Sequence, residues 1–178
     1  MAWFSYFAYG SNMLLERLRA KDRCPSARVM GPASAVGVEV KFAKRSKDGS
    51  GKATLIRVEG ATTYGVLFAI DESERESLMK AEGAGYYWVD DFAMRGTLDG
   101  RVTQAMTFFA SADYFAPDLQ PFDWYLALSL AGGKQNALPE DYVRKLGAVA
   151  SMPDPVKERA TRLEALRALR EAGMEVFV

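Results

Sequence analysis

The sequence predicts an α+β fold in which a mainly antiparallel sheet curls into a barrel-like core with flanking helices. Most strand-like segments come early and are joined by local turns, whereas helical segments cluster late in the chain. These turns are too short for the crossovers that parallel strands need. A chain of 178 residues has the size of one ordinary domain, and no linker or internal repeat divides it. We therefore expect a single domain spanning residues 1–178.

Six strands are expected in the first 110 residues. Residues 3–9 are aromatic or small and apolar, which is typical of a buried strand. Between residues 36 and 42 every second side chain is apolar, which indicates a strand with one buried face. A turn at residues 98–100 predicts an antiparallel hairpin. The expected strands are residues 3–9, 35–43, 53–58, 62–70, 86–95 and 102–110.

Five helices are expected. Ser11 or Asn12 can cap the first, and Asp154 can cap the last. The Gly132-Gly133 pair predicts the end of the third helix, since glycine is unfavourable inside helices. The expected helices are residues 12–20, 71–82, 121–131, 139–149 and 156–172.

The polar, glycine-rich segment 44–52 lies between two expected strands. The simplest interpretation is a mobile hairpin loop. A lid over a binding site is the less favoured alternative.

The composition excludes several classes of function. The chain carries 23 basic and 23 acidic side chains, so neither nucleic acid nor an anionic membrane is expected as the main partner. No segment approaches the apolar length that spans a bilayer, and the start lacks the pattern of a secretory signal. The single cysteine, Cys24, cannot form an internal disulfide. A cytoplasmic location is therefore the expectation.

The chain contains no histidine. Nucleophilic triads and dyads that use histidine are therefore excluded, as are the usual catalytic zinc sites. We expect no cofactor and no metal, and proton transfer in any enzyme reaction would fall to a carboxylate, a lysine or a tyrosine.

The turn around Gly10 is the first candidate site. A strand, a glycine and a helix start follow one another here, which leaves free backbone N–H groups that favour a carboxylate or another anion. The alternative interpretation is a turn that only connects a strand to a helix, as in many domains.

Glu82 is the second candidate. It ends an amphipathic helix, where the helix dipole disfavours an acid, and glycines and aromatic residues follow it. An exposed acid at a helix end is the ordinary alternative. A residue placed against its local preference is a hint of function.

Together these stretches resemble the γ-glutamylcyclotransferase family, which belongs to the AIG2-like superfamily. Residues 6–13, YFAYGSNM, are similar to the family's YxxYGSNL/M signature. Further similarity lies in the GVL…EG…Y block and in the GAKENGLPxxY segment, with a G-x-A-T element before a strand. The matching residues are 51–54, 65–68, Glu82-Gly83, Tyr87 and 133–142.

The resemblance implies a small protein with a barrel-like sheet that cyclises a γ-glutamyl group and releases 5-oxoproline. It implies that the catalytic acid–base is Glu82, that no cofactor is needed, and that the main partner is a small γ-glutamyl substrate; a homodimer is left open. Whether Tyr86 or Tyr87 contacts the substrate is also left open. The substrate-binding residues implied are Tyr6, Phe7, Ala8, Tyr9, Gly10, Ser11, Asn12, Tyr87 and Tyr125.

This chemistry suits a chain without histidine. The substrate's own α-amine attacks its γ-carbonyl, so the protein needs no nucleophile, and a glutamate made more basic by burial can accept the amine proton. Alternatives from the sequence are a cyclotransferase acting on γ-glutamylamines or on a γ-glutamyl-protected intermediate, and a relative that binds small molecules without turnover.

Overall fold

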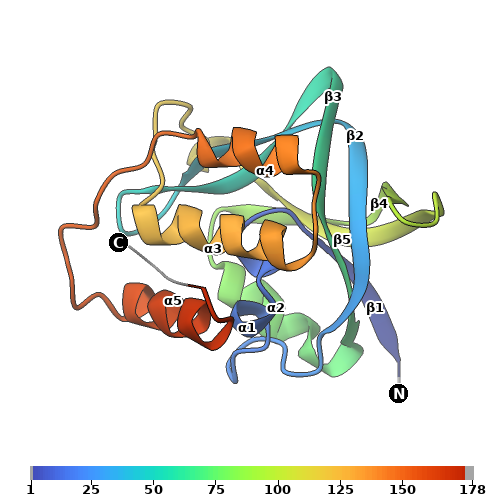
Figure 1. Ribbon diagram of the computed structural model, residues 1–178, viewed down its shortest axis with the longest axis horizontal. Helices are drawn as coiled ribbons and strands as arrows, with labels where there is room; N and C mark the ends of the chain where they lie inside the picture. Colours follow the sequence, from blue (N-terminus) through green and yellow to red (C-terminus); the bar gives the residue numbers. More distant parts are fainter. Residues whose placement is uncertain (1, 175–178) are drawn as a thin grey trace.

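The computed structural model describes residues 2–174 and shows a closed barrel of five strands with helices packed around it (Figure 1). The strand order around the barrel is β1-β3-β2-β4-β5. Strand β1 (Trp3–Ala8) pairs antiparallel with β3 (Gly51–Asp71) and parallel with β5 (Val102–Ala110), which closes the barrel. The expected α+β class and the barrel-like, mainly antiparallel sheet are confirmed.

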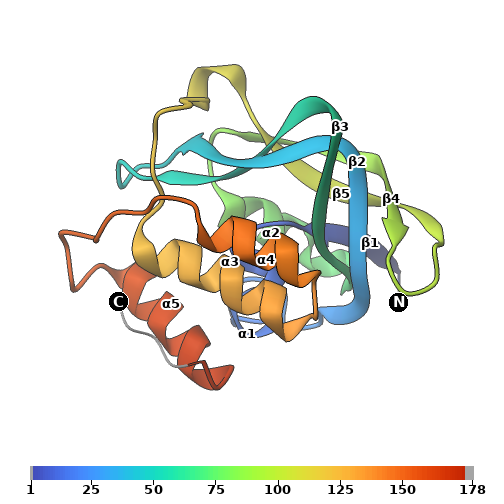
Figure 2. The same ribbon diagram turned by 45° about the horizontal axis from the view of Figure 1, so that its top comes forward.

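The longest hairpin is formed by β2 (Arg28–Arg45) and β3. The chain runs through residues 59–61 without a break, so the prediction of two separate strands there was wrong. Gly60 adopts a φ of 75° within β3, and the pairing shifts register between Val36 and Val38 on the partner strand. These features let the hairpin bend around the barrel without interrupting its strands (Figure 2).

The expected hairpin at the other side of the barrel is confirmed. Strand β4 (Tyr86–Gly96) pairs antiparallel with β5, and a register shift lies between Val89 and Phe92. β4 also pairs with β2 through residues 33–34.

The first helix is shorter than predicted and is split into a 3-10 turn, η1 (Ser11–Met13), and one turn of α-helix, α1 (Leu15–Leu18). Neither has a side-chain cap, so the prediction that Ser11 or Asn12 caps a helix was wrong. Helix α2 (Arg75–Glu82) ends at the predicted residue.

Three helices finish the chain: α3 (Asp123–Gln135), α4 (Glu140–Gly147) and α5 (Ala160–Glu171). Helix α3 continues through Gly132-Gly133, against the prediction that it ends there. A Cβ on Gly132 would lie 2.5 Å from the backbone of Met13 and Leu14. The glycine therefore serves close packing of α3 on η1 rather than helix termination.

The hairpin tip between β2 and β3 is tied down by polar contacts. Asp48 accepts hydrogen bonds from Ser50 and Lys52, and the Gly51 N–H donates to the carbonyl of Gln120. Within residues 2–174 no helix is long and apolar enough to cross a membrane.

Candidate active site

The end of α2 meets the turn after β1, although 70 residues separate them in sequence. The side-chain amide of Asn12 donates to the Glu82 carboxylate at 2.5 Å and to the Tyr6 hydroxyl at 3.2 Å. Asn12 does not cap a helix because its side chain makes these two bonds instead. The acid and the glycine turn thus lie at one place, as the sequence led us to expect.

Around this contact lies a small cavity of about 20 Å³. Its rim includes Ser11, Glu82 and Tyr86, which are partly exposed, whereas the other lining residues are buried. The cavity has about the volume that one water molecule needs. It is lined by Tyr6, Tyr9, Gly10, Ser11, Asn12, Ala53, Glu82, Tyr86, Phe108 and Tyr125.

Ala53 of β3 is fixed beneath the glycine turn by two tyrosine hydroxyls. The Ala53 N–H donates to the Tyr125 hydroxyl at 3.2 Å, and the Tyr86 hydroxyl donates to the Ala53 carbonyl at 2.6 Å. A Cβ on Gly10 would lie 2.8 Å from the Ala53 Cβ, which real side chains do not tolerate without a shift. Glycine is therefore required at position 10 by the close approach of two chain segments.

Backbone donors are available at the turn. Met13 and Leu14 donate their N–H groups to the carbonyls of Gly10 and Ser11. Within residues 2–174 the N–H groups of Ser11 and Asn12 find no acceptor in the protein. Donors of this kind beside a cavity can hold a carboxylate or a developing oxyanion.

The environment of Glu82 makes its carboxylate more basic. Burial raises the pKa of Glu82, while the positive charge of Arg23, the hydrogen bond from Asn12 and the charges of Arg17 and Lys44 oppose that rise. The net direction is upward. A carboxylate with a raised pKa is a better proton acceptor.

The surrounding phenols stay protonated. Burial, followed by the charge of Glu82, raises the pKa of Tyr6 and of Tyr9 well above the ordinary value, and burial does the same for Tyr86. The cavity therefore presents neutral hydroxyl groups around one acid. Among residues 2–174 no cluster of three or more His, Cys, Asp or Glu side chains is arranged to hold a metal ion.

Three of the sequence-predicted residues do not line the cavity. Phe7 and Ala8 are fully buried in the barrel, where Phe7 stacks on Phe92. Tyr87 is 49% exposed and stacks on Phe109. Its neighbour Tyr86 lines the cavity instead.

Sequence reasoning missed several residues of this region. Ala53 had a signal, because the G-x-A-T element includes it, but its place beneath Gly10 had not been predicted. Phe108, Arg17, Arg23 and Lys44 carried no local signal, since their relation to Glu82 depends on how the barrel closes.

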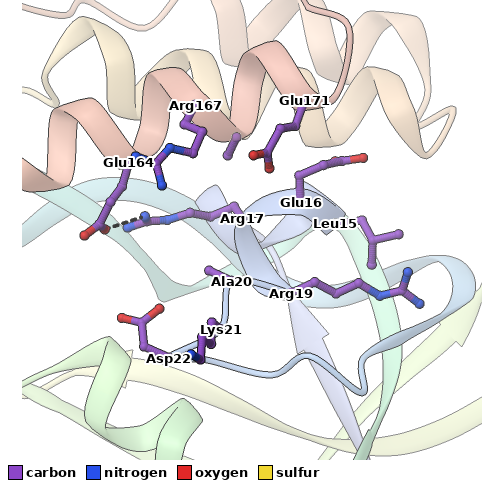
Figure 3. A pocket seen from close by; sticks show the side chains of 11 residues that line it. Leu15, Glu16, Arg17, Arg19, Ala20, Lys21, Asp22, Glu164, Arg167 and Glu171 are labelled. Carbon is purple, nitrogen blue, oxygen red and sulfur yellow. Dashed lines mark hydrogen bonds and ion pairs between the residues drawn. The ribbon is translucent and has the colours of Figure 1, made fainter.

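A second cavity, of about 860 Å³, lies between α1 and α5 (Figure 3). Its wall is formed by charged side chains of both signs, and Arg17 reaches Glu164 of α5 at 3.3 Å. None of the residues predicted from the sequence to act in catalysis or binding lines it.

Comparison with known proteins places the chain in a family. The AIG2-like family model matches residues 62–146. Human γ-glutamylcyclotransferase is 30% identical over 153 residues, which is 82% of this chain and 78% of the human protein, and the mouse protein matches equally. The chain belongs to the γ-glutamylcyclotransferase family.

A solved structure of a γ-glutamyl cyclotransferase superposes on the chain with a TM-score of 0.81 and 25% identity, covering 93% of this chain and 99% of that structure. The family fold therefore extends over nearly the whole chain.

Proposed function

We propose that the protein is a γ-glutamylcyclotransferase that converts a γ-glutamyl donor into 5-oxoproline and a free amine or amino acid. The observation that carries this proposal is the Glu82 carboxyl group, held by Asn12 inside a cavity whose floor is the Gly10 turn. Family membership supports the same reaction class.

The reaction needs no nucleophile from the protein. The α-amine of the γ-glutamyl group forms a bond to its own γ-carbonyl carbon, and the bond from that carbon to the leaving nitrogen then breaks. One proton leaves the attacking amine and one reaches the leaving nitrogen. Holding the two reacting groups of one molecule together can lower the barrier by roughly 7–11 kcal/mol in favourable cases.

Glu82 is the group we assign to proton transfer. Its carboxylate accepts the proton from the attacking amine and passes it to the leaving nitrogen. The raised pKa of Glu82 brings it closer to the pKa of the substrate amine, which favours transfer of the proton from the amine to Glu82. The nearby cations Arg23, Arg17 and Lys44 keep part of the population ionised, which the base role requires.

The free N–H groups of Ser11 and Asn12 are assigned to the substrate. Backbone donors at a turn stabilise negative charge, either on the substrate carboxylate or on the oxygen of the tetrahedral intermediate. The hydroxyls of Tyr6, Tyr9 and Tyr125 add neutral polar surface to the same space.

The size of the cavity sets a requirement on binding. A γ-glutamyl group is far larger than a space of about 20 Å³, so the cavity has to widen when the substrate enters. The partly exposed residues Ser11 and Tyr86 lie where such widening needs least displacement of buried groups.

The test is release of 5-oxoproline from a panel of γ-glutamyl donors incubated with the purified protein. The panel contains γ-glutamyl amino acids, γ-glutamylamines and glutathione, with the corresponding α-glutamyl dipeptides as controls. We expect 5-oxoproline from at least one γ-glutamyl donor and none from the α-glutamyl controls. Binding of donors in a thermal-shift assay without product from any of them would contradict the proposal and favour a non-catalytic binding protein.

A further inference from the structure

Lys44 is a buried cation that lies against Tyr86, one of the residues that line the Glu82 cavity. It lies near the end of strand β2, where it pairs with Lys52, and the residue is only 6% exposed. Its ammonium group lies 4.6 Å from the ring centre of Tyr86 and 5.8 Å from that of Tyr114. Because Tyr86 belongs to the cavity rim and Tyr114 is 39% exposed, Lys44 lies between the cavity and the protein surface.

The paired residue Lys52 shows how this hairpin neutralises a buried ammonium group. Lys52 bonds to Asp48 at 2.9 Å and to the Ser50 hydroxyl at 2.8 Å, and aromatic rings cover it. Lys44 has the rings only: within the part of the chain that the structure describes, no carboxylate lies within ion-pair distance of it. A largely buried ammonium group without a direct ion pair keeps its hydrogen-bond donors available, so its site is suited to an anionic ligand.

The ammonium group is also close enough to Glu82 for the two charges to interact. The positive charge of Lys44 lowers the pKa of Glu82, and the negative charge of Glu82 raises that of Lys44 against the effect of burial. A ligand that contacts both groups would therefore place its reacting centre at Glu82 and a nearby negative charge at Lys44.

We propose that Lys44 is a specificity-determining residue that binds the carboxylate of the leaving amino acid. This inference rests on the proposed function. In a γ-glutamyl amino acid the leaving nitrogen is attached to the carbon that carries the carboxylate, so the negative charge lies next to the scissile bond. A γ-glutamylamine has no such group. Lys44 takes no part in bond making; it favours donors whose leaving group carries a carboxylate.

The test compares two donors that differ by one carboxylate, γ-glutamylalanine and γ-glutamylethylamine. In the wild-type protein we expect kcat/KM to be about 10- to 100-fold higher for γ-glutamylalanine, the range of one charge-assisted hydrogen bond. In Lys44→Met, kcat/KM for γ-glutamylalanine should fall by a similar factor. The value for γ-glutamylethylamine should change far less, so the ratio between the donors falls.

Two further variants separate binding of the carboxylate from general effects. Lys44→Arg keeps a cation and should retain most of the donor ratio. Lys47→Met removes one exposed positive charge from the same hairpin and should leave the ratio unchanged. Because a change in the basicity of Glu82 affects both donors, the change in their ratio reports mainly on the leaving group.

The outcomes distinguish this inference from the proposed function. A wild-type protein that releases 5-oxoproline from both donors at equal kcat/KM overturns the role of Lys44 and leaves the proposed function intact. An equal fall for both donors in Lys44→Met also overturns it, since that result indicates a structural role. If neither donor, nor any other, gives 5-oxoproline, the proposed function itself has failed. The wild-type ratio needs no variant, so the inference stays testable if Lys44→Met does not fold.

Discussion

Two cavities of this molecule differ both in size and in the chemistry of their walls. The cavity between α1 and α5 has about 860 Å³ and is bordered by charges of both signs that face one another and solvent. The cavity at Glu82 has about 20 Å³, yet it joins one acid whose pKa is raised by burial, two backbone N–H groups without an acceptor among residues 2–174, and a set of neutral hydroxyls. By volume alone, the cavity between α1 and α5 would be the candidate active site. The chemistry of the lining groups favours the cavity at Glu82 instead.

The physical reason lies in the dielectric environment. In the ion pair between Arg17 and Glu164 the guanidinium is buried but the acid side chain is 49% exposed, so water screens the charge of Glu164. At Glu82, burial changes the basicity of the acid and makes nearby charges effective. The comparison therefore predicts that substitutions around the small cavity change turnover, whereas matched substitutions around the large one do not.

Glu82→Gln is expected to have the largest effect. The amide retains the size of the side chain and can still contact Asn12, but it cannot accept a proton. We expect kcat to fall by about 10²- to 10⁴-fold, the usual contribution of a general acid–base. The measurement is 5-oxoproline release, with circular dichroism to verify the fold.

Glu164→Gln is the matched control in the larger cavity. It makes the same chemical change at an acid that bonds to Arg17, and kcat should stay within about twofold of the wild-type value. Loss of activity in this variant, with activity retained in Glu82→Gln, would exchange the roles of the two cavities.

Gly10→Val is expected to have the next largest effect. Its Cβ would meet Ala53 at 2.8 Å, so the turn must move away from β3 and disturb the cavity floor. We expect KM to rise by at least tenfold and the free energy of unfolding to fall by about 1–3 kcal/mol, as for overpacking elsewhere. Gly147→Ala is the control, because its Cβ meets Leu130 at an ordinary 3.5 Å. Unchanged substrate affinity in Gly10→Val, measured by calorimetry, would remove the turn from the site.

Tyr86→Phe and Tyr87→Phe test the two faces of β4 with a smaller expected effect. Tyr86→Phe loses the hydrogen bond to the Ala53 carbonyl, which costs about 1 kcal/mol and loosens the cavity wall, so kcat/KM should fall several-fold. Tyr87→Phe keeps the ring that stacks on Phe109 and should leave kcat/KM within about twofold. A larger loss in Tyr87→Phe would indicate that the substrate binds on the outer face.

These two tyrosines also show where sequence reasoning stops. The pairing of Glu82 with the Gly10 turn could be predicted, because both stretches carry a recognisable pattern. The sequence could not predict which of the two adjacent tyrosines faces inward. Successive side chains of a strand point to opposite faces, and a shift of one residue in register reverses them. A register shift in β4 between Val89 and Phe92 adds to this ambiguity.

Lys44 was missed for a similar reason. The polar, glycine-rich composition of residues 44–52 predicted a loop there. In the structure Lys44 still belongs to β2, beyond a register shift in the β2–β3 pairing between Lys41 and Lys44, and its ammonium group lies against the ring of Tyr86. The glycines at residues 60 and 132–133 were wrongly predicted to end a strand and a helix. In the structure Gly60 allows β3 to bend, and Gly132 allows α3 to pack closely on the turn after β1. The same residue type ends elements in other contexts, so composition alone cannot separate the two uses.

The smallest expected effect concerns stability rather than turnover, and it measures the cost of enclosing an acid. Burial raises the pKa of Glu82 in the folded state above its ordinary value of 4.5. Between pH 4.5 and the pKa of Glu82 in the folded state, the folded state binds more protons than the unfolded state. The stability associated with this group is therefore present below pH 4.5 and is lost as the pH rises through the folded pKa. Gln carries no such proton. The difference in the free energy of unfolding, Glu82→Gln minus wild type, should therefore increase from acidic to neutral pH, with a slope of at most about 1.4 kcal/mol per pH unit. Urea denaturation of both proteins across this range measures the difference, and a value that stays constant or decreases with pH would mean that the carboxyl group is not enclosed as the small cavity requires.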